Sequence, residues 1–235
     1  MNKKIALILA FALTIPVVAG AEDKVAQNQQ MRASMGVVTD RAGFQKMVDS
    51  SSEVYRSIAS GPRGEVPSAI LNNARCIGVL PGVGTGALII GGTHGKGLVS
   101  CKNANKEWSQ PAPIALNQGS IGLQAGAKSA DLVLFFQTLE AEKALKRGEF
   151  TLGADVSAVA GQYDSKVDTS NAGVVVYSRA EGAYAGASVN SSKISKNQTD
   201  LESYYGKGVD FAALLEGRHA SDRAFDSTTL TKLFP

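Results

Sequence analysis

The chain has 235 residues, of which 44% are hydrophobic and 19% charged, and its formal net charge is +3. Residues 1–21 hold two of the 24 basic residues and none of the 21 acidic ones, so the remainder is nearly neutral. A general attraction to nucleic acid or to an anionic membrane is therefore not expected, and nucleic acid is not a predicted partner. Any binding of an anion must come from a local patch of charge. The length suits one domain with a sizeable core.

Residues 1–21 predict a signal peptide. Lys3 and Lys4 form a basic start, residues 5–18 are apolar, and residues 19–21 are small, as a cleavage site requires. The apolar run is shorter than the roughly 20 residues of a membrane span. No cysteine directly follows the cleavage site, so a bacterial lipid anchor is not expected. We expect a soluble protein that is exported to the periplasm or secreted, with an uncleaved anchor as the alternative.

The remaining chain is predicted to form a polar tether or weak helix over residues 22–39 and one domain over residues 40–235. An amphipathic helix opens this domain and ends before a Gly-Pro pair. Its apolar stripe either packs on a sheet or contacts a membrane. Pro67 then starts a short helix over residues 67–74. The stripe consists of Phe44, Met47, Val48, Val54, Tyr55 and Ile58.

The segment from Cys76 to Cys101 predicts an antiparallel meander of three short strands. Short runs rich in Val, Ile and Leu that are bounded by Gly and Pro are typical of strands. Pro81-Gly82 and the His94-Gly95 region supply the residues expected in turns. The runs are residues 76–80, 87–90 and 97–101.

A polar loop over residues 103–113 follows, and it contains the only tryptophan, Trp108. Alternating apolar residues predict a half-buried strand over residues 120–126, and a continuous apolar run predicts a strand buried on both faces over residues 132–136. Thr138 is expected to cap a helix that ends at Arg147 and is stopped by Gly148.

Beyond this helix, alternation predicts a long strand over residues 150–160 and then a hairpin. A polar break separates the hairpin from short helices near the end of the chain. The expected ranges are 174–177 and 182–189 for the hairpin, 193–198 for the break, and 201–205, 209–215 and 228–233 for the helices.

About eight strands, with helices at both ends and one between, predict an α+β fold. Gly and Ala occupy many strand positions, where Gly weakens a strand unless a bulge, a tight bend or a close backbone needs the space. We therefore expect a strongly curved, largely antiparallel sheet or a partly closed barrel with flanking helices. A ligand cavity lined by small residues is the alternative.

Cys76 and Cys101 are the only two cysteines. In an exported protein they predict a disulfide. Two buried free thiols are one alternative, and a zinc site that includes His94 is the other, although such a site lacks a ligand and the spacing of a zinc finger. His219 is far from His94 in sequence. We predict no metal and no cofactor.

Catalytic motifs are mostly absent. Residues 82–87 resemble a dinucleotide loop, but an apolar strand-like run follows them where that motif requires a helix. Asp155 falls in the middle of the strand predicted over residues 150–160, where Asp is rare. It is either a structural acceptor of hydrogen bonds or part of a site. No second titrating group is nominated for acid–base chemistry, so we predict that the protein is not an enzyme.

Seven ordered motifs make the chain similar to the SYLF lipid-binding domain family. The similarity extends from Gln45 to Leu215. The motifs are Cys76–Val83, Gly95–Cys101, Trp108–Pro111, Gly119–Gly122, Asp131–Leu134, Leu152–Asp155 and Tyr204–Gly206.

The resemblance implies a compact α+β lipid-binding module without known catalysis. Eukaryotic members of that family resemble peripheral membrane proteins that recognise anionic phosphoinositides and can engage actin. Thr93-His94 replaces the Arg-Tyr type pair found in the family, and residues 24–39 have no clear match to its membrane-contacting helix. The implied property that we carry over is therefore lipid binding and not the identity of the lipid.

The sequence thus predicts an exported, non-catalytic module that binds anionic phospholipid or a membrane surface in the cell envelope. The candidate contacts are Lys96, Lys102 and Lys106 for phosphate groups and Trp108 for the interface. An ordinary solvated loop is the alternative for these residues. For the whole protein, the alternative is an envelope scaffold that binds protein partners without lipid specificity.

Overall fold

The computed structural model describes residues 41–59, 66–86, 90–121, 128–160, 172–180, 191–218 and 228–235. These ranges lie within one compact unit, Asp40–Pro235. The predicted signal peptide, the tether, the strand over residues 182–189 and His219 lie outside the described residues.

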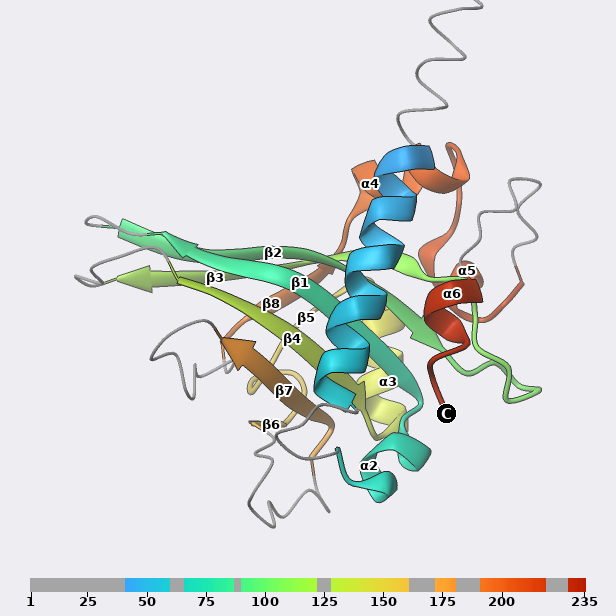
Figure 1. Ribbon diagram of the computed structural model, residues 1–235, viewed down its shortest axis with the longest axis horizontal. Helices are drawn as coiled ribbons and strands as arrows, with labels where there is room; N and C mark the ends of the chain where they lie inside the picture. Colours follow the sequence, from blue (N-terminus) through green and yellow to red (C-terminus); the bar gives the residue numbers. More distant parts are fainter. Residues whose placement is uncertain are drawn as a thin grey trace, which may run out of the picture. The chain divides into compact units, whose positions relative to one another are not determined.

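An eight-stranded sheet forms the centre of the described part of the chain, in the order β5-β8-β3-β2-β1-β4-β7-β6. Neighbouring strands are antiparallel except for β6 and β7. The sheet curls strongly into half a barrel, with β1 and β2 in its middle (Figure 1). The predicted α+β fold with a strongly curved, largely antiparallel sheet is confirmed. The strands are β1 (Cys76–Gly86), β2 (Ile90–Cys101), β3 (Ala112–Ile121), β4 (Lys128–Phe136), β5 (Glu149–Thr151), β6 (Ala158–Ala160), β7 (Val174–Ala180) and β8 (Lys193–Lys196).

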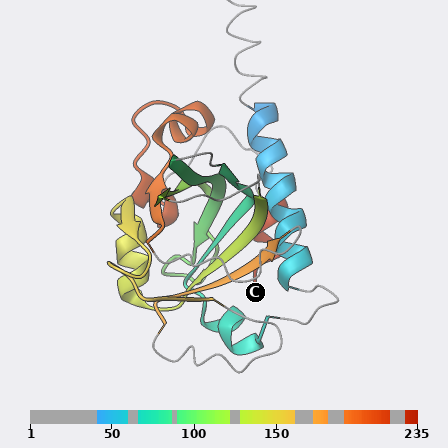
Figure 2. The same ribbon diagram turned by 90° about the vertical axis from the view of Figure 1, so that its left-hand side faces the viewer.

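Helices lie on both sides of this sheet. Figure 2 shows the helix over residues 41–59 on one side and α3 (Leu139–Lys146) on the other. Phe44, Val48 and Ile58 of the first helix are fully buried in the core. Its apolar stripe therefore packs inside the domain, and the membrane-contact alternative for that stripe is wrong. The remaining labelled helices are α2 (Ser68–Asn73), α4 (Gln198–Tyr205), α5 (Phe211–Leu215) and α6 (Thr228–Thr231).

The two turns predicted within the meander are wrong, because Pro81-Gly82 and His94-Gly95 lie inside the long strands β1 and β2. Most of the middle strand of that prediction, residues 87–89, lies outside the described residues. Pro81-Gly82 lies within β1 as a bulge, where the register shifts against both β2 and β4. Gly82 has a φ of 59°, and its N–H donates to Asp131 Oδ1 over 2.9 Å. The residues that favour turns also suit a bulge, since Pro lacks an N–H and Gly tolerates positive φ. The His94-Gly95 region is likewise a continuous part of β2.

Close approach of this bulge explains two glycines of β2. A Cβ on Gly97 would lie 2.1 Å from the carbonyl oxygen of Val79, and one on Gly95 would lie 2.6 Å from Val83 Cγ2. Either side chain would collide with β1. The glycines of Gly95-Lys96-Gly97 therefore permit strand packing, and Lys96 between them is exposed.

Helix α3 agrees with its prediction. Thr138 Oγ1 accepts the N–H of Ala141 over 3.2 Å, and Gly148 has a φ of 89°. The predicted cap and stop are both confirmed.

The strand predicted over residues 150–160 is wrong, because a turn over residues 153–155 separates β5 from β6. Gly153 there has a φ of 82°. Apolar alternation continues across the turn because Leu152 and Val156 on its two flanks are both buried.

The polar break predicted over residues 193–198 is also wrong at its start. Strand β8 forms there, because one buried side chain, Ile194, is enough to place it between β3 and β5.

Aromatic contacts hold the C-terminal helices to the helix over residues 41–59. The Phe44 ring lies 4.7 Å from Tyr204 and 5.7 Å from Tyr205 between centroids. The Tyr205 hydroxyl donates to the carbonyl oxygen of Pro111 over 2.6 Å, and burial raises its pKa. The helices predicted near residues 201–205, 209–215 and 228–233 are present as α4, α5 and α6 with small differences in their bounds.

Candidate membrane-contact site

The start of β1 and the end of β2 are joined by a disulfide between Cys76 and Cys101. The two residues are direct partners in the antiparallel register, and both are fully buried. The predicted disulfide is confirmed, and the free-thiol and zinc alternatives are wrong. The chain therefore leaves the sheet after Cys101 from a fixed point.

A short loop, residues 102–108, follows this point and is closed by a bridge between Lys102 and Trp108. The side-chain oxygen of Asn103 accepts the N–H groups of Asn105 and Glu107, over 2.9 and 3.0 Å. The backbone N–H of Asn103 also donates to the carbonyl oxygen of Glu107 over 2.8 Å. These bonds form a tight turn, and Lys106 within it has a φ of 64°.

Buried serines attach the base of this loop to β2. Ser109 Oγ accepts the N–H of Cys101 over 3.1 Å, and Ser100 Oγ donates to the carbonyl oxygen of Ser109 over 2.5 Å. Ser100 and Ser109 are both buried. The disulfide and these bonds make the loop a rigid extension of the sheet.

Two lysines, Lys102 and Lys106, belong to this loop. The Lys102 ammonium lies 5.0 Å from the centre of the Trp108 ring, in the geometry of a cation–π contact. Burial and then the positive charge of Lys106 lower the pKa of Lys102. Lys106 is exposed. The loop thus carries two like charges, and one of them lies over an aromatic ring.

Trp108 is partly covered by the end of the chain. Its indole N–H donates to the carbonyl oxygen of Pro235 over 2.9 Å. The ring of Phe234 packs edge-on against it, with 5.0 Å between centroids. Trp108 is half-buried in this arrangement.

Lys96, the fourth predicted contact, lies elsewhere. It precedes Lys102 by six residues on β2, which corresponds to about 20 Å along a strand. Its ammonium pairs with Asp200 Oδ2 of α4 over 3.0 Å. The structure therefore brings Lys102, Lys106 and Trp108 together and separates Lys96 from them.

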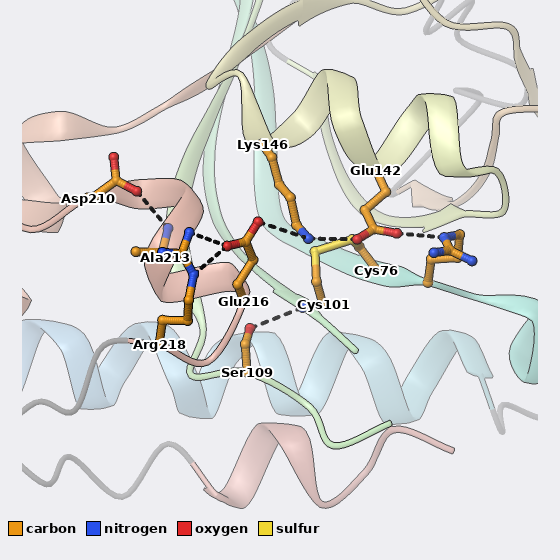
Figure 3. A network of polar contacts seen from close by, with 10 residues as sticks. Cys76, Cys101, Ser109, Glu142, Lys146, Asp210, Ala213, Glu216 and Arg218 are labelled. Atoms are coloured by element: carbon orange, nitrogen blue, oxygen red, sulfur yellow. Dashed lines mark hydrogen bonds and ion pairs between the residues drawn. A yellow bond between two sulfur atoms is a disulfide. The ribbon is translucent and has the colours of Figure 1, made fainter. Parts of the chain in front are cut away.

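A network of charged side chains supports the same end of the hairpin (Figure 3). Glu142 of α3, only 7% exposed, accepts a hydrogen bond from Arg75 over 2.5 Å and one from Lys146 over 2.6 Å. Lys146 also lies 3.7 Å from Glu216, which pairs with Arg218. Burial raises the pKa of Glu142, but hydrogen bonds and charges of Lys146 and Arg75 together bring it below its ordinary value. Because Arg75 precedes Cys76, the network fixes α3 to the start of β1.

Asp155 lies in the exposed turn over residues 153–155. Its Oδ2 atom accepts the N–H of Thr151 over 2.7 Å. This contact fits the structural alternative for Asp155. Among the residues described, no three side chains of the His, Cys, Asp and Glu types gather in a way that could bind a metal ion.

Sequence reasoning missed three residues of the site: Asn103, Phe234 and Pro235. Asn is typical of turns because its side chain accepts backbone N–H groups, so Asn103 carried a usable signal. The contact of Phe234 and Pro235 with Trp108 joins residues more than a hundred positions apart, and no local pattern predicts it.

None of the described helices combines the length and the hydropathy that crossing a membrane requires.

Residues 117–233 match the model of the Ysc84 family, whose description is Las17-binding protein actin regulator. The chain contains a domain of the Ysc84, or SYLF, family. It is 27% identical over 169 residues to LAS seventeen-binding protein 3 of Saccharomyces cerevisiae, covering 68% of the chain and 37% of the yeast protein. It is 24% identical over 164 residues to SH3 domain-containing YSC84-like protein 1 of Homo sapiens, covering 67% of the chain and 48% of the human protein.

The chain thus spans between roughly a third and a half of the length of these curated Ysc84 relatives. No solved structure matches it significantly.

Proposed function

We propose that this Ysc84-family chain is an exported, non-catalytic module that contacts anionic phospholipid surfaces in the cell envelope. The contact is the loop over residues 102–108. Lys102 and Lys106 meet phosphate groups, and Trp108 lies at the level of the headgroups. The proposal specifies the charge of the surface and no particular lipid.

Two lysines and Trp108 on one rigid loop, with Lys102 over the Trp108 ring, are the observation that carries this proposal. Burial and the charge of Lys106 lower the pKa of Lys102, and Lys106 itself adopts a φ of 64°. Both features cost stability in the free protein. An anionic surface turns the repulsion into attraction, worth about 1 kcal/mol for each lysine. The adjacent Trp108 has an apolar ring and one polar N–H, which suits a membrane interface.

Export is the second part of the proposal, and the pattern of residues 1–21 supports it. The disulfide supports it as well, because disulfides persist mainly in oxidising compartments. Sequencing the N-terminus of protein recovered from the cell envelope tests it, with the first residue expected directly after Ala21. Recovery only from the cell interior, beginning at Met1, contradicts export.

A protein-binding module is the second candidate. The family description and the name of the yeast relative both refer to binding of Las17, which is a property of those proteins. An envelope scaffold without lipid specificity would place a protein partner where we propose a membrane.

Pelleting with vesicles separates the two candidates. The full chain, purified under oxidising conditions, is mixed with vesicles rich in phosphatidylglycerol or with pure phosphatidylcholine vesicles at low salt. We expect pelleting with the anionic vesicles only, and added salt should weaken it because ions screen exposed charges. Binding should also raise the pKa of Lys102, measured by NMR of the lysine side chains, because an anion offsets the charge of Lys106. If neither vesicle binds, the membrane proposal is wrong and the protein-binding candidate leads.

A further inference from the structure

We propose that residues 228–235, the C-terminal latch, cover Trp108 and gate its access to the membrane. The inference rests on the proposed function, because it names how that contact is regulated. The inference follows from the position of the Phe234 ring.

Phe234 of the latch lies between two aromatic residues from distant parts of the chain. Its ring centroid is 4.9 Å from that of Tyr55 and 5.0 Å from that of Trp108, both edge-on. Phe234 is only 7% exposed. In this closed arrangement the indole N–H of Trp108 is also satisfied, by Pro235.

The latch has features of a segment that can detach as a unit. Two of its backbone hydrogen bonds are internal, from Leu233 N–H to Leu230 O and from Phe234 N–H to Thr231 O. Helix α6 within it has only four residues. Leu230, which is 1% exposed, and Phe234 are buried, and Leu233 is partly buried against the core. Short segments that few side chains hold open at lower free energy than the core of a domain.

Opening of the latch would uncover Tyr55 and Trp108, the two residues that Phe234 contacts. Tyr55 and Trp108 both combine an apolar ring with a polar group, the combination that suits the headgroup region of a membrane. Lys102 lies over the Trp108 ring, and Lys106 belongs to the same loop over residues 102–108. A membrane that binds Trp108 must displace Phe234. The apparent affinity for the membrane is therefore the affinity of the open form multiplied by the fraction of molecules that are open.

Phe234→Ala tests the latch, and Trp108 serves as the reporter because the chain has one tryptophan. Losing two aromatic contacts should raise the affinity for phosphatidylglycerol-rich vesicles by about three- to tenfold. Before vesicles are added, acrylamide should quench Trp108 fluorescence more strongly in the variant. After addition, the emission should shift further to the blue than in the unchanged protein.

Phe150→Ala is the matched control. Phe150 is 2% exposed and contacts Phe136, 5.9 Å away between centroids, and it lies in β5 at the edge of the sheet. It should lower stability and leave vesicle affinity unchanged. An equal gain in affinity from Phe150→Ala overturns the latch, because general loosening then explains the effect.

Hydrogen exchange on the unchanged protein decides the case if Phe234→Ala does not fold. With vesicles present, the amides of Leu233 and Phe234 should exchange faster, and unchanged or slower exchange overturns the latch. A folded Phe234→Ala variant with exposed Trp108 and unchanged affinity also overturns it, while binding by the unchanged protein keeps the proposed function. If neither protein binds vesicles, the proposed function fails and the latch fails with it.

Discussion

The disulfide end and the middle of the β1–β2 hairpin are built in opposite ways. The disulfide end has a buried disulfide, serines that bond to the backbone, and α3 attached through Arg75. The middle has a bulge at Pro81-Gly82 and the closely packed Gly95 and Gly97. The disulfide end is fixed by covalent and polar links, and the middle by the absence of side chains.

Each of these two regions carries a lysine, and the surroundings of the two lysines differ. Lys96 near the bulge has an acidic partner, Asp200, whereas Lys102 beyond the disulfide shares its loop with Lys106, whose positive charge adds to burial in lowering the pKa of Lys102. A like-charge pair persists only where the surrounding structure is fixed strongly enough to hold it. The comparison teaches that a lysine count in a sequence does not identify a binding site, because the neighbours of each lysine decide whether its charge is available.

Breaking the disulfide should give the largest effect on stability. The two cysteines are separated by 25 residues, and the chain-entropy model then gives a loss of about 3.5 kcal/mol on reduction. Urea unfolding of oxidised and reduced protein measures it. Thiol titration of unfolded, unreduced protein should find no free thiol, and two free thiols would contradict the bridge.

Adding one methyl group beside the bulge should be nearly as costly. Gly97→Ala places a Cβ against the Val79 carbonyl oxygen, and overpacking of this kind costs about 2–3 kcal/mol. Gly84→Ala is the control, since a Cβ there meets nothing within 4 Å. Urea unfolding should show a loss under 1 kcal/mol for the control. Equal losses for the two variants would mean that the close approach of the strands is not what requires Gly97.

The two lysine environments can be compared directly by vesicle binding. Replacing Lys102 and Lys106 with Gln should weaken binding to anionic vesicles by up to about 2 kcal/mol, or roughly thirtyfold, and reduce its salt dependence. Folding stability should change little, because the removal of a repulsion offsets the loss of the contact between Lys102 and the Trp108 ring. Lys96→Gln is the control and should leave binding unchanged while losing under about 1 kcal/mol of stability, as an exposed ion pair does. An equal loss of binding in the control would return Lys96 to the site.

Acidification should give the smallest effect, through Glu142. The pKa of Glu142 in the folded protein lies below its ordinary value of 4.5. Its carboxylate therefore stabilises the fold fully above about pH 4.5, and this contribution is lost as the pH falls through the folded pKa. Glu142→Gln should cost about 1 kcal/mol at pH 7 and flatten the acid side of the stability profile. A profile identical to that of the unchanged protein would show that the Arg75 and Lys146 contacts do not stabilise the charged form.

Local patterns were enough to predict much of this fold. Thr138 and Gly148 act within one helix, so their signals are complete in a few residues of sequence. The glycine-rich strands indicated a strongly curved sheet for a similar reason. Gly at a strand position indicates a bulge, a bend or a close backbone, and such positions can be read directly from the sequence. The pairing of Cys76 with Cys101 followed from there being two cysteines.

Only the tertiary structure decided which neighbours each residue has. Pro81-Gly82 has the same local preferences in a turn and in a bulge, and pairing with β2 and β4 selects the bulge. Lys96 resembled Lys102 in sequence, but Asp200 lies beside only Lys96. Trp108 gained its cover from Phe234, far along the chain. The sequence by itself determined the helix that begins at Thr138 and ends at Gly148 and the curvature of the sheet, because these depend on short-range sterics and hydrogen bonding. The structure decided which charges and rings are available, because long-range packing sets their surroundings.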